Sequence, residues 1–154
     1  TYFSKYDIVR DDYRAVMASC ALPGFCRPVK VGDRYYYDGG VADSIPLHHA
    51  IEQGCTKMVV ILSNPRNFVK KPEAHRPLYK HMLHKYPKTI QSIDNRHINY
   101  QASIDLACRL EKEGYVFIFA PSRHMPLSTF SKDAALEQDL YDLGVAEELK
   151  HFLN

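Results

Sequence analysis

The chain contains 154 residues, of which 45% are hydrophobic and 25% charged, a composition typical of folded globular proteins and not of intrinsically disordered ones. Its 20 basic and 18 acidic side chains are spread along the sequence and give a formal net charge of only +2, so nucleic acid is not expected as a partner. The longest apolar runs have about six or seven residues, far fewer than the roughly 20 that cross a bilayer, so no membrane-spanning segment is predicted.

The first elements that the sequence predicts are a helix and a β-hairpin. Apolar residues between positions 11 and 21 recur at three- and four-residue spacing until Pro23-Gly24 ends the pattern, which indicates a helix packed on a core. Two β-prone runs follow, at 29–31 and 35–37, and the turn residues Gly32-Asp33 separate them. This arrangement predicts a hairpin.

A short helix and two buried strands come next. Ser44 is placed to cap the helix, Pro46 falls in its first turn and Gly54 ends it. Continuous apolar runs at 58–62 and 116–120 are typical of strands that are covered on both faces. Two such strands with helices between them predict an α/β fold, layered as α/β/α around a mainly parallel sheet.

The remaining segments are predicted to be exposed or helical. Residues 67–88 are rich in lysine and histidine and are expected to be exposed, residues 89–112 have the spacing of a helix, and residues 131–152 predict one or two amphipathic helices broken near Gly144. A stable open sheet usually has about four to six strands. We therefore expect residues 1–154 to be a single domain that is incomplete, with its missing strands before Thr1.

The most informative stretch lies between Met17 and Gly54. It contains A-S-C-A-L-P-G-F at 18–25, P-V at 28–29, Y-Y-D-G-G at 36–40 and S-I-P at 44–46. By itself D-G-G predicts only a tight turn. The ordered series resembles the patatin-like phospholipase family, in which A-S-x-A-x-P precedes an aromatic residue, P-V, a glycine and then Y-x-D-G-G or D-G-A. The apolar run after Gly54 continues the order seen in that family.

The resemblance implies a Ser-Asp dyad on an α/β fold, in which the aspartate of D-G-G accepts the proton of a nucleophilic serine. Asp38 takes that place and is the expected catalytic base. A serine hydroxyl is a poor nucleophile until an adjacent base takes its proton. Gly39 and Gly40 are expected to support the catalytic turn, because glycine lets the backbone turn sharply and approach the serine closely. At Ser44 the sequence departs from the family, which often has asparagine shortly after D-G-G.

The serine of the dyad is not in this chain. Neither a G-x-S-x-G nucleophile elbow nor the glycine-rich loop that the family uses as an oxyanion hole occurs between Thr1 and Asn154. Both come earlier in the family's order, so we expect the C-terminal half of a patatin-like serine acyl hydrolase, inactive alone. The parent would hydrolyse esters of phospholipids or other acyl lipids, with no metal or organic cofactor implied. The alternative is a non-catalytic lipid-binding or regulatory module of the same fold.

Other polar residues are weaker candidates. Ser19 lies within A-S-x-A-x-P, but no glycine elbow surrounds it. His48-His49 and His81-x-x-His84 have no acidic or cysteine residues at zinc-site spacing. Together with His97 and His124 they are expected to be solvated on helix surfaces. A Ser-His-Asp triad stays open in principle because triads are recognised by geometry, although the resemblance argues against it.

Three features bear on partners and location. A basic segment is interleaved with Tyr79 and Tyr86, and its lysines are Lys70, Lys71, Lys80, Lys85 and Lys88. Such a segment could contact anionic lipid head groups, but a solvated loop and helix is the favoured interpretation. The cysteines lack a C-x-x-C pair, which predicts buried, reduced thiols and a cytoplasmic location, at most peripheral at a membrane; they are Cys20, Cys26, Cys55 and Cys108. Uncovered edges of an incomplete sheet predict that the chain self-associates or binds its missing half.

Overall fold

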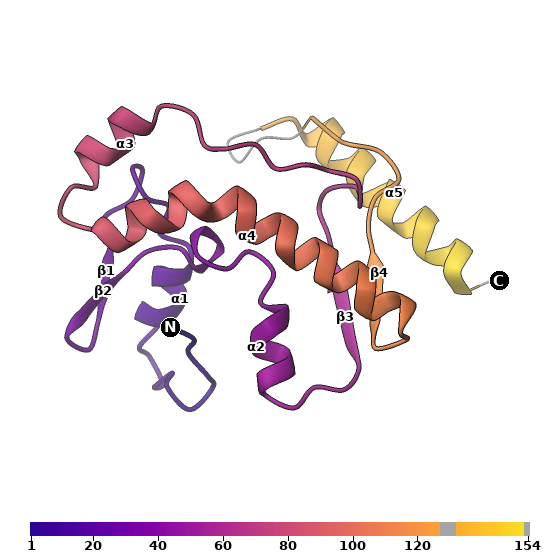
Figure 1. Cartoon of the computed structure of the whole chain (residues 1–154), viewed down its shortest axis with the longest axis horizontal. Coiled ribbons are helices and arrows are strands. Elements are labelled where there is room, and N and C mark those ends of the chain that lie inside the picture. The colour runs from indigo at the N-terminus through magenta and orange to yellow at the C-terminus, as the bar shows by residue number, and fades with distance from the viewer. Residues whose placement is uncertain (127–131, 153–154) are drawn as a thin grey trace. The chain divides into compact units, whose positions relative to one another are not determined.

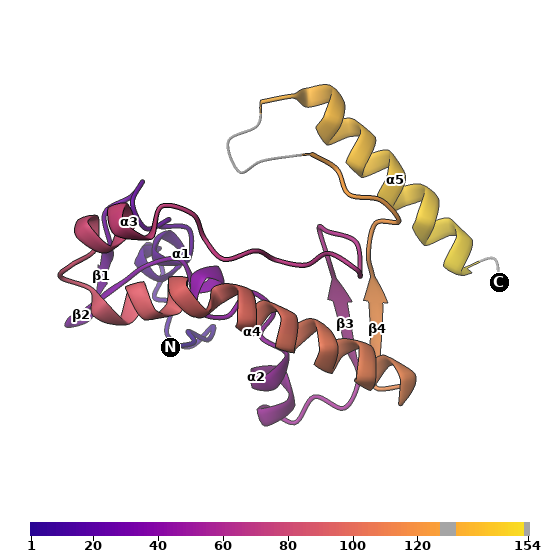
Figure 2. The ribbon, with the colours of Figure 1, turned by 45° about the horizontal axis from the view of Figure 1, so that its top comes forward.

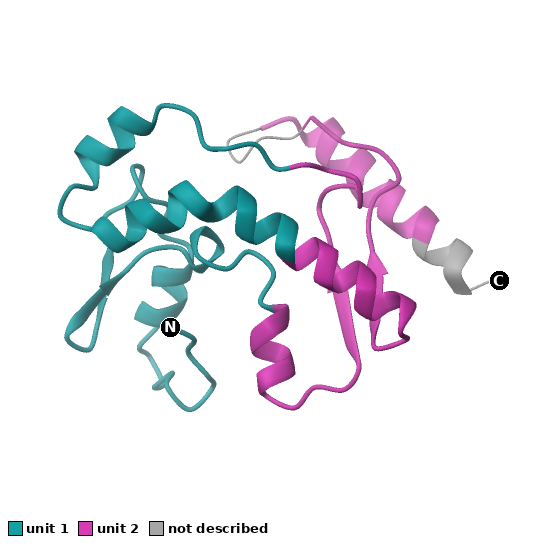
Figure 3. Cartoon of the chain, in the orientation of Figure 1, with its two compact units in different colours: residues 1–46, 70–102 teal, residues 47–69, 103–154 magenta. Residues whose placement is uncertain are grey.

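A computed structural model of the chain describes residues 1–126 and 132–152, with side chains in the second segment described as far as Glu147 (Figure 1). It is a mixed α/β structure in which helices accompany a small parallel sheet. The chain divides into two compact units: Thr1–Pro46 with Lys70–Ala102, and Leu47–Val69 with Ser103–Asn154 (Figure 3). The long helix α4 (Pro87–Lys112) contributes its first part to unit 1 and its last part to unit 2.

Unit 1 contains the predicted helix and hairpin. The helix is α1 (Arg14–Ser19), and the hairpin consists of β1 (Val29–Val31) and β2 (Arg34–Tyr36). The two strands pair antiparallel with Val29 opposite Tyr36 and Val31 opposite Arg34. Gly32 forms the turn at a φ of 58°, a left-handed conformation that favours glycine. The short 3₁₀-helix η1 (Gly39–Val41) follows the hairpin after Tyr37 and Asp38, so the hairpin directly places the D-G-G segment.

The core of unit 1 joins the end of η1 to the helices behind it. Val41, Leu83 and Ile93 are buried in one cluster. The rings of Tyr37 and Tyr86 meet edge to face at the border of this cluster, with their centroids 5.5 Å apart. Burial, and to a lesser degree the neighbouring Tyr86, raises the pKa of Tyr37. The residues on both sides of Asp38-Gly39-Gly40 are therefore packed against the first part of α4.

The segment 67–88 contains a helix, α3 (Arg76–Met82), none of whose residues is buried, as expected for a solvated loop and helix. Pro77 lies in the first turn, where proline is tolerated. The two tyrosines of the basic segment, Tyr79 and Tyr86, are partly buried and pack against the core cluster.

A carboxylate on α4 holds α3 in place. Asp94 accepts two hydrogen bonds from the Arg76 guanidinium, at 2.8 and 2.7 Å, and one from the Tyr79 hydroxyl at 2.6 Å. Such paired, charge-assisted bonds favour the ionised carboxylate. Chiefly through Arg76 and then Tyr79, they lower the pKa of Asp94 from 3.8 to about 2.

Replacing Asp94 should therefore have a pH-dependent effect on stability. Because the pKa of Asp94 is lower in the folded state, its carboxylate stabilises unit 1 above about pH 4, and this contribution is lost as the pH falls towards about 2. Asp94→Asn should lower the urea midpoint at pH 7, and the difference from wild type should close between pH 4 and pH 2. Asp139→Asn, at an exposed position of the helix at Ala134–Phe152, is the control. A pH-independent difference would contradict this explanation.

Unit 2 is built on a parallel pair of strands. After α2 (Leu47–Glu52), β3 (Met58–Ile61) pairs with β4 (Val116–Phe119), from Met58 opposite Val116 to Ile61 opposite Phe119 (Figure 2). The buried apolar side chains of this unit come from the strand segments and from the last part of α4, and they include Val60, Leu62, Val116, Ile118, Ile104, Leu106 and Ala107. The α/β character is confirmed, with a small parallel sheet.

Only one face of this strand pair is covered within the described residues. Side chains alternate between the faces of a strand. Val60 and Ile118 are buried, whereas Val59 and Ile61 are 63% and 79% exposed and Phe117 is 39% exposed. The expectation that both strands are covered on both faces is therefore wrong for this chain. An apolar run indicates that a strand is suited to burial on both sides, but the covering elements must come from elsewhere in the structure.

The two outer edges of the strand pair also differ. On β4 the amide of Ile118 donates to Glu111 Oε1 at 3.2 Å, and its carbonyl accepts from Arg66 Nη2 at 2.7 Å. Arg66 and Glu111 are themselves joined as an ion pair, so their side chains occupy this edge. On β3 the backbone groups of Val59 and Ile61 face away from β4, and no partner for them is found in the described part of the chain.

The C-terminal helix is continuous where a break was predicted. α5 (Ala134–Phe152) passes through Gly144 without interruption, and Asp133 Oδ1 accepts from the amides of Ala135 and Leu136 at its start. The predicted start at residue 131 lies outside the described residues. A single glycine costs a helix only about 1 kcal/mol relative to alanine, which neighbouring turns outweigh. Among the helices described, none is long and apolar enough to span a bilayer.

The cysteines are reduced but less buried than predicted. All four are free thiols. Cys20, Cys26 and Cys55 are exposed, and Cys108 is half-buried. The expectation of small buried apolar side chains is therefore wrong for three of the four positions. Spacing alone does not tell which face of a short helix or loop a residue occupies.

Candidate active site

Asp38 is the N-cap of the 3₁₀-helix η1. It follows β2 and Tyr37 directly, its side chain is half-buried, and Oδ1 accepts a hydrogen bond from the amide of Gly40 at 2.6 Å. An aspartate is well suited to this position because its short side chain reaches the backbone amide two residues on. One carboxylate oxygen is thus fixed, and Oδ2 has no hydrogen-bond partner among the described residues.

The end of α1 supports the same turn from the other side. The amide of Asp38 donates to the carbonyl of Ala21 at 2.9 Å. Ala18 and Ala21 are buried, with 2% and 4% exposure, and their small side chains fit where two backbone segments come close together. The A-S-x-A-x-P and D-G-G parts of the motif series, which lie about 20 residues apart in the sequence, therefore meet in the structure.

The structure shows the backbone conformation and the surroundings of the two glycines. Neither Gly39 nor Gly40 adopts a positive φ, so the sharp turn itself does not require glycine. A Cβ added at Gly40 would lie 3.1 Å from Asp38 Oδ1, whereas one added at Gly39 would meet nothing within 4 Å. Within this chain Gly40 therefore leaves space for the Asp38 carboxylate, and Gly39 leaves an exposed backbone.

The carbonyl of Gly40 accepts two hydrogen bonds that the sequence did not predict. Ser44 Oγ donates to it at 2.6 Å and Arg96 Nε at 3.1 Å. The Ser44 hydroxyl therefore bonds back to the D-G-G turn, and α2 begins only at Leu47. Sequence reasoning missed Arg96 because 56 residues separate it from Gly40 and no local motif marks it.

A pocket of about 320 Å³ lies beside Asp38 and Gly39 within unit 1. Its walls mix aromatic and polar side chains, and they include Tyr2, Tyr35, Tyr36, Tyr37, Lys88 and Ser92. Pockets of this size and mixed character can hold part of a small organic ligand. Asp38 is thus next to space of this size within unit 1.

The remaining candidates do not join this site. The Ser19 hydroxyl donates to the carbonyl of Val16 at 2.8 Å. The His84 ring bonds the His81 carbonyl at 2.9 Å, and the His124 ring stacks on Phe68. His97 differs from the expectation of a solvated ring, because its Nδ1 is buried and has no hydrogen-bond partner in the described structure.

No metal cluster is found in the part of the chain that the structure describes. There, no group of three or more histidine, cysteine, aspartate or glutamate side chains is arranged to hold an ion. His49 instead lies 3.8 Å from Glu52 on the same short helix. The polar groups around Asp38 are backbone amides and carbonyls with a serine and an arginine, which are suited to fixing a carboxylate.

The Asp38 segment matches the model of a known family. A model of the patatin-like phospholipase family matches residues 9–51, which include α1, the hairpin and the whole D-G-G turn. The resemblance seen in the sequence is therefore confirmed for this segment. A second model, a domain of unknown function designated DUF6363, matches residues 86–154, which include α4 and α5.

One similar protein is the uncharacterized protein YjjU of Escherichia coli (strain K12). It is 39% identical over 59 residues, which are 38% of this chain and 16% of that protein. The chain therefore matches only a small part of the length of this relative. No solved structure matches the chain.

Proposed function

We propose that this chain supplies the catalytic base of a lipid acyl hydrolase in which Asp38 forms a dyad with a serine. The observation that carries the proposal is the D-G-G turn within the family segment, where Asp38 has one carboxylate oxygen fixed by the Gly40 amide and lines a pocket. A base that is held at one oxygen keeps its second oxygen in a defined direction. Such fixed orientation is what proton transfer requires.

In this proposal Asp38 Oδ2 takes the proton of the serine hydroxyl as the serine oxygen attacks the ester carbonyl carbon. The protonated carboxyl then returns that proton to the leaving alcohol, and an acyl-enzyme remains. Water enters, gives a proton to the carboxylate and attacks the acyl carbon, which releases the fatty acid and restores the serine. The substrates would be carboxylic esters of phospholipids or other acyl lipids.

The nucleophile and the oxyanion hole belong to other parts of the full-length polypeptide in this proposal. The chain would be the C-terminal half of the hydrolase domain and inactive alone, since neither a G-x-S-x-G elbow nor a glycine-rich loop occurs in it. The three exposed free thiols are compatible with the proposed cytoplasmic location. Contact with a membrane would be peripheral, at the surface where lipid substrates lie.

The test is ester hydrolysis by the full-length polypeptide. Hydrolysis of a short-chain p-nitrophenyl ester, together with covalent labelling by a fluorophosphonate, is expected in the wild type. Asp38→Asn should abolish most of the hydrolysis. If the full-length polypeptide bound phospholipid vesicles but neither hydrolysed esters nor reacted with the probe, the non-catalytic lipid-binding module would be the better explanation.

We also propose that the isolated chain associates with a second copy through the uncovered face of β3 and β4. Val59 and Ile61 are exposed there, and the outer edge of β3 has free backbone groups among the described residues. Sedimentation velocity should show concentration-dependent association, and Ile61→Lys should reduce it. Val69→Lys, at a position that is 69% exposed in a loop, should not. A monomer over a wide concentration range would refute this prediction.

A further inference from the structure

An arginine connects the two segments that different family models match. Arg96 lies on α4, within the residues matched by the model of unknown function. Its Nε donates to the carbonyl of Gly40, in the patatin-like segment, at 3.1 Å. We propose that Arg96 is a positioning residue for Asp38, and that α4 serves to hold the D-G-G turn. The role of Arg96 in catalysis rests on the function proposed for Asp38.

The connection from Arg96 to the Asp38 carboxylate passes through one residue. The amide of Gly40 donates to Asp38 Oδ1 at 2.6 Å, and the carbonyl of Gly40 accepts from Arg96. Both peptide groups of Gly40 are therefore held, one by the carboxylate and the other by the guanidinium together with the Ser44 hydroxyl, which donates to the same carbonyl at 2.6 Å. Because Gly40 has no side chain to limit its rotation, these bonds together fix the direction of the amide that orients Asp38.

Arg96 is itself held in a defined position. Its side chain is 29% exposed, and Nη1 donates to Glu73 Oε1 at 3.1 Å. Lys70 lies 3.8 Å from the same glutamate oxygen. One turn further along α4, Asn99 Nδ2 donates to the carbonyl of Ala42 at 3.5 Å. Residues three apart share a helix face, so one face of α4 contacts the turn at two carbonyls, those of Gly40 and Ala42.

The chemistry of arginine fits this task better than that of lysine. The planar guanidinium donates in two directions at once, here to a backbone carbonyl and to a carboxylate. A bond from a charged donor is also stronger than one between neutral groups. A lysine at the same position would keep the charge, but its single ammonium group cannot reproduce the fixed fork.

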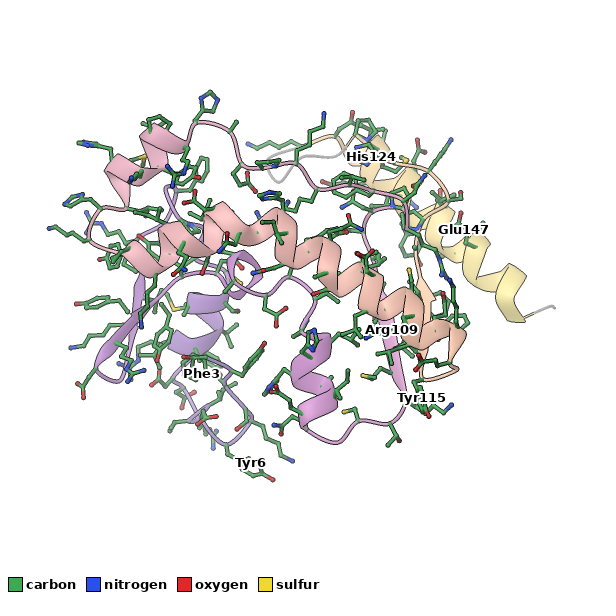
Figure 4. The ribbon with its side chains drawn as sticks, in the orientation of Figure 1. Phe3, Tyr6, Arg109, Tyr115, His124 and Glu147 are labelled. Atoms are coloured by element: carbon green, nitrogen blue, oxygen red, sulfur yellow. The ribbon has the colours of Figure 1, made fainter. Side chains whose placement is uncertain are left out.

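The experiment compares three variants of the full-length polypeptide. Arg96→Met removes both hydrogen bonds and keeps an unbranched apolar side chain, Arg96→Lys keeps the charge, and Arg109→Met changes an exposed arginine of the same helix (Figure 4). Two quantities are measured for each: kcat and KM for ester hydrolysis, and hydrogen exchange of the Gly40 amide.

Arg96→Met should lower kcat by about 10- to 100-fold, the effect of displacing a catalytic group by about 1 Å, with little change in KM. The Gly40 amide should exchange faster, while the thermal midpoint stays close to that of the wild type. Arg96→Lys should recover part of both losses, and Arg109→Met should match the wild type. Wild-type kcat and Gly40 exchange in Arg96→Met, or equal losses in Arg109→Met, would overturn the proposal.

The exchange measurement separates this proposal from the function on which it rests. If Asp38→Asn kept full activity, the dyad would be wrong. Faster Gly40 exchange in Arg96→Met would then still show that α4 holds the turn, but the catalytic role of Arg96 would be refuted. If Asp38→Asn lost activity and Arg96→Met did not, the dyad would be supported and the positioning role of Arg96 would be refuted.

Discussion

Asp38→Asn in the full-length polypeptide should lower kcat/KM for ester hydrolysis by about 10²- to 10⁴-fold, the usual contribution of a general base. The substitution is nearly isosteric. The amide oxygen of the new side chain can still accept the hydrogen bond that Gly40 donates to Oδ1, so the turn and η1 should be kept. What is lost is an anionic second oxygen that can take a proton from serine.

A matched control makes this loss interpretable. Asp33→Asn changes an exposed aspartate in the turn of the same hairpin and should leave kcat/KM unchanged. Both variants should have the same circular dichroism spectrum and thermal midpoint as the wild type. Equal activity in the Asp38 variant and the wild type would remove Asp38 from the dyad. Equal losses in both variants would point to damage of the hairpin and not to missing base chemistry.

The elements that the sequence predicted correctly are those whose signals are local. Gly32 marks the hairpin turn because a positive φ is needed there, and the apolar runs mark β3 and β4 because β-branched residues recur without interruption. The family resemblance is likewise carried by short motifs between Met17 and Gly54, and it singled out Asp38 without any knowledge of long-range contacts.

What the sequence did not predict depends on contacts between distant residues. In the sequence Arg76 is an ordinary basic residue of a lysine-rich segment. In the structure Asp94, 18 positions later, accepts hydrogen bonds from its guanidinium and fixes α3. Arg96 in the same way becomes part of the site only through Gly40. The exposure of one face of β3 was also not predicted. An apolar run shows that a strand is suited to burial, but it does not show whether the same chain covers one face or both.

Gly40 and Gly39 test what glycine does in the D-G-G turn, because the structure gives them different surroundings. Gly40→Ala would put a methyl group 3.1 Å from Asp38 Oδ1, closer than such groups normally come, and the carboxylate would have to move. We expect kcat to fall by about 10- to 100-fold, since small displacements of a catalytic group have effects of that size. Gly39→Ala places its methyl group in open space within this chain and should have the smaller effect.

The stability of the two variants shows whether an activity loss is local. Neither glycine has a positive φ, so alanine fits the backbone at both positions and also reduces the entropy of the unfolded chain. Urea midpoints of both variants should therefore equal or exceed that of the wild type. A stable Gly40→Ala with wild-type kcat would show that the Asp38 carboxylate need not stay where the Gly40 amide holds it. If Gly39→Ala instead lost more activity than Gly40→Ala, the explanation would be that the segment with the nucleophile comes close to the exposed backbone of Gly39. A side chain at position 39 would then block that approach.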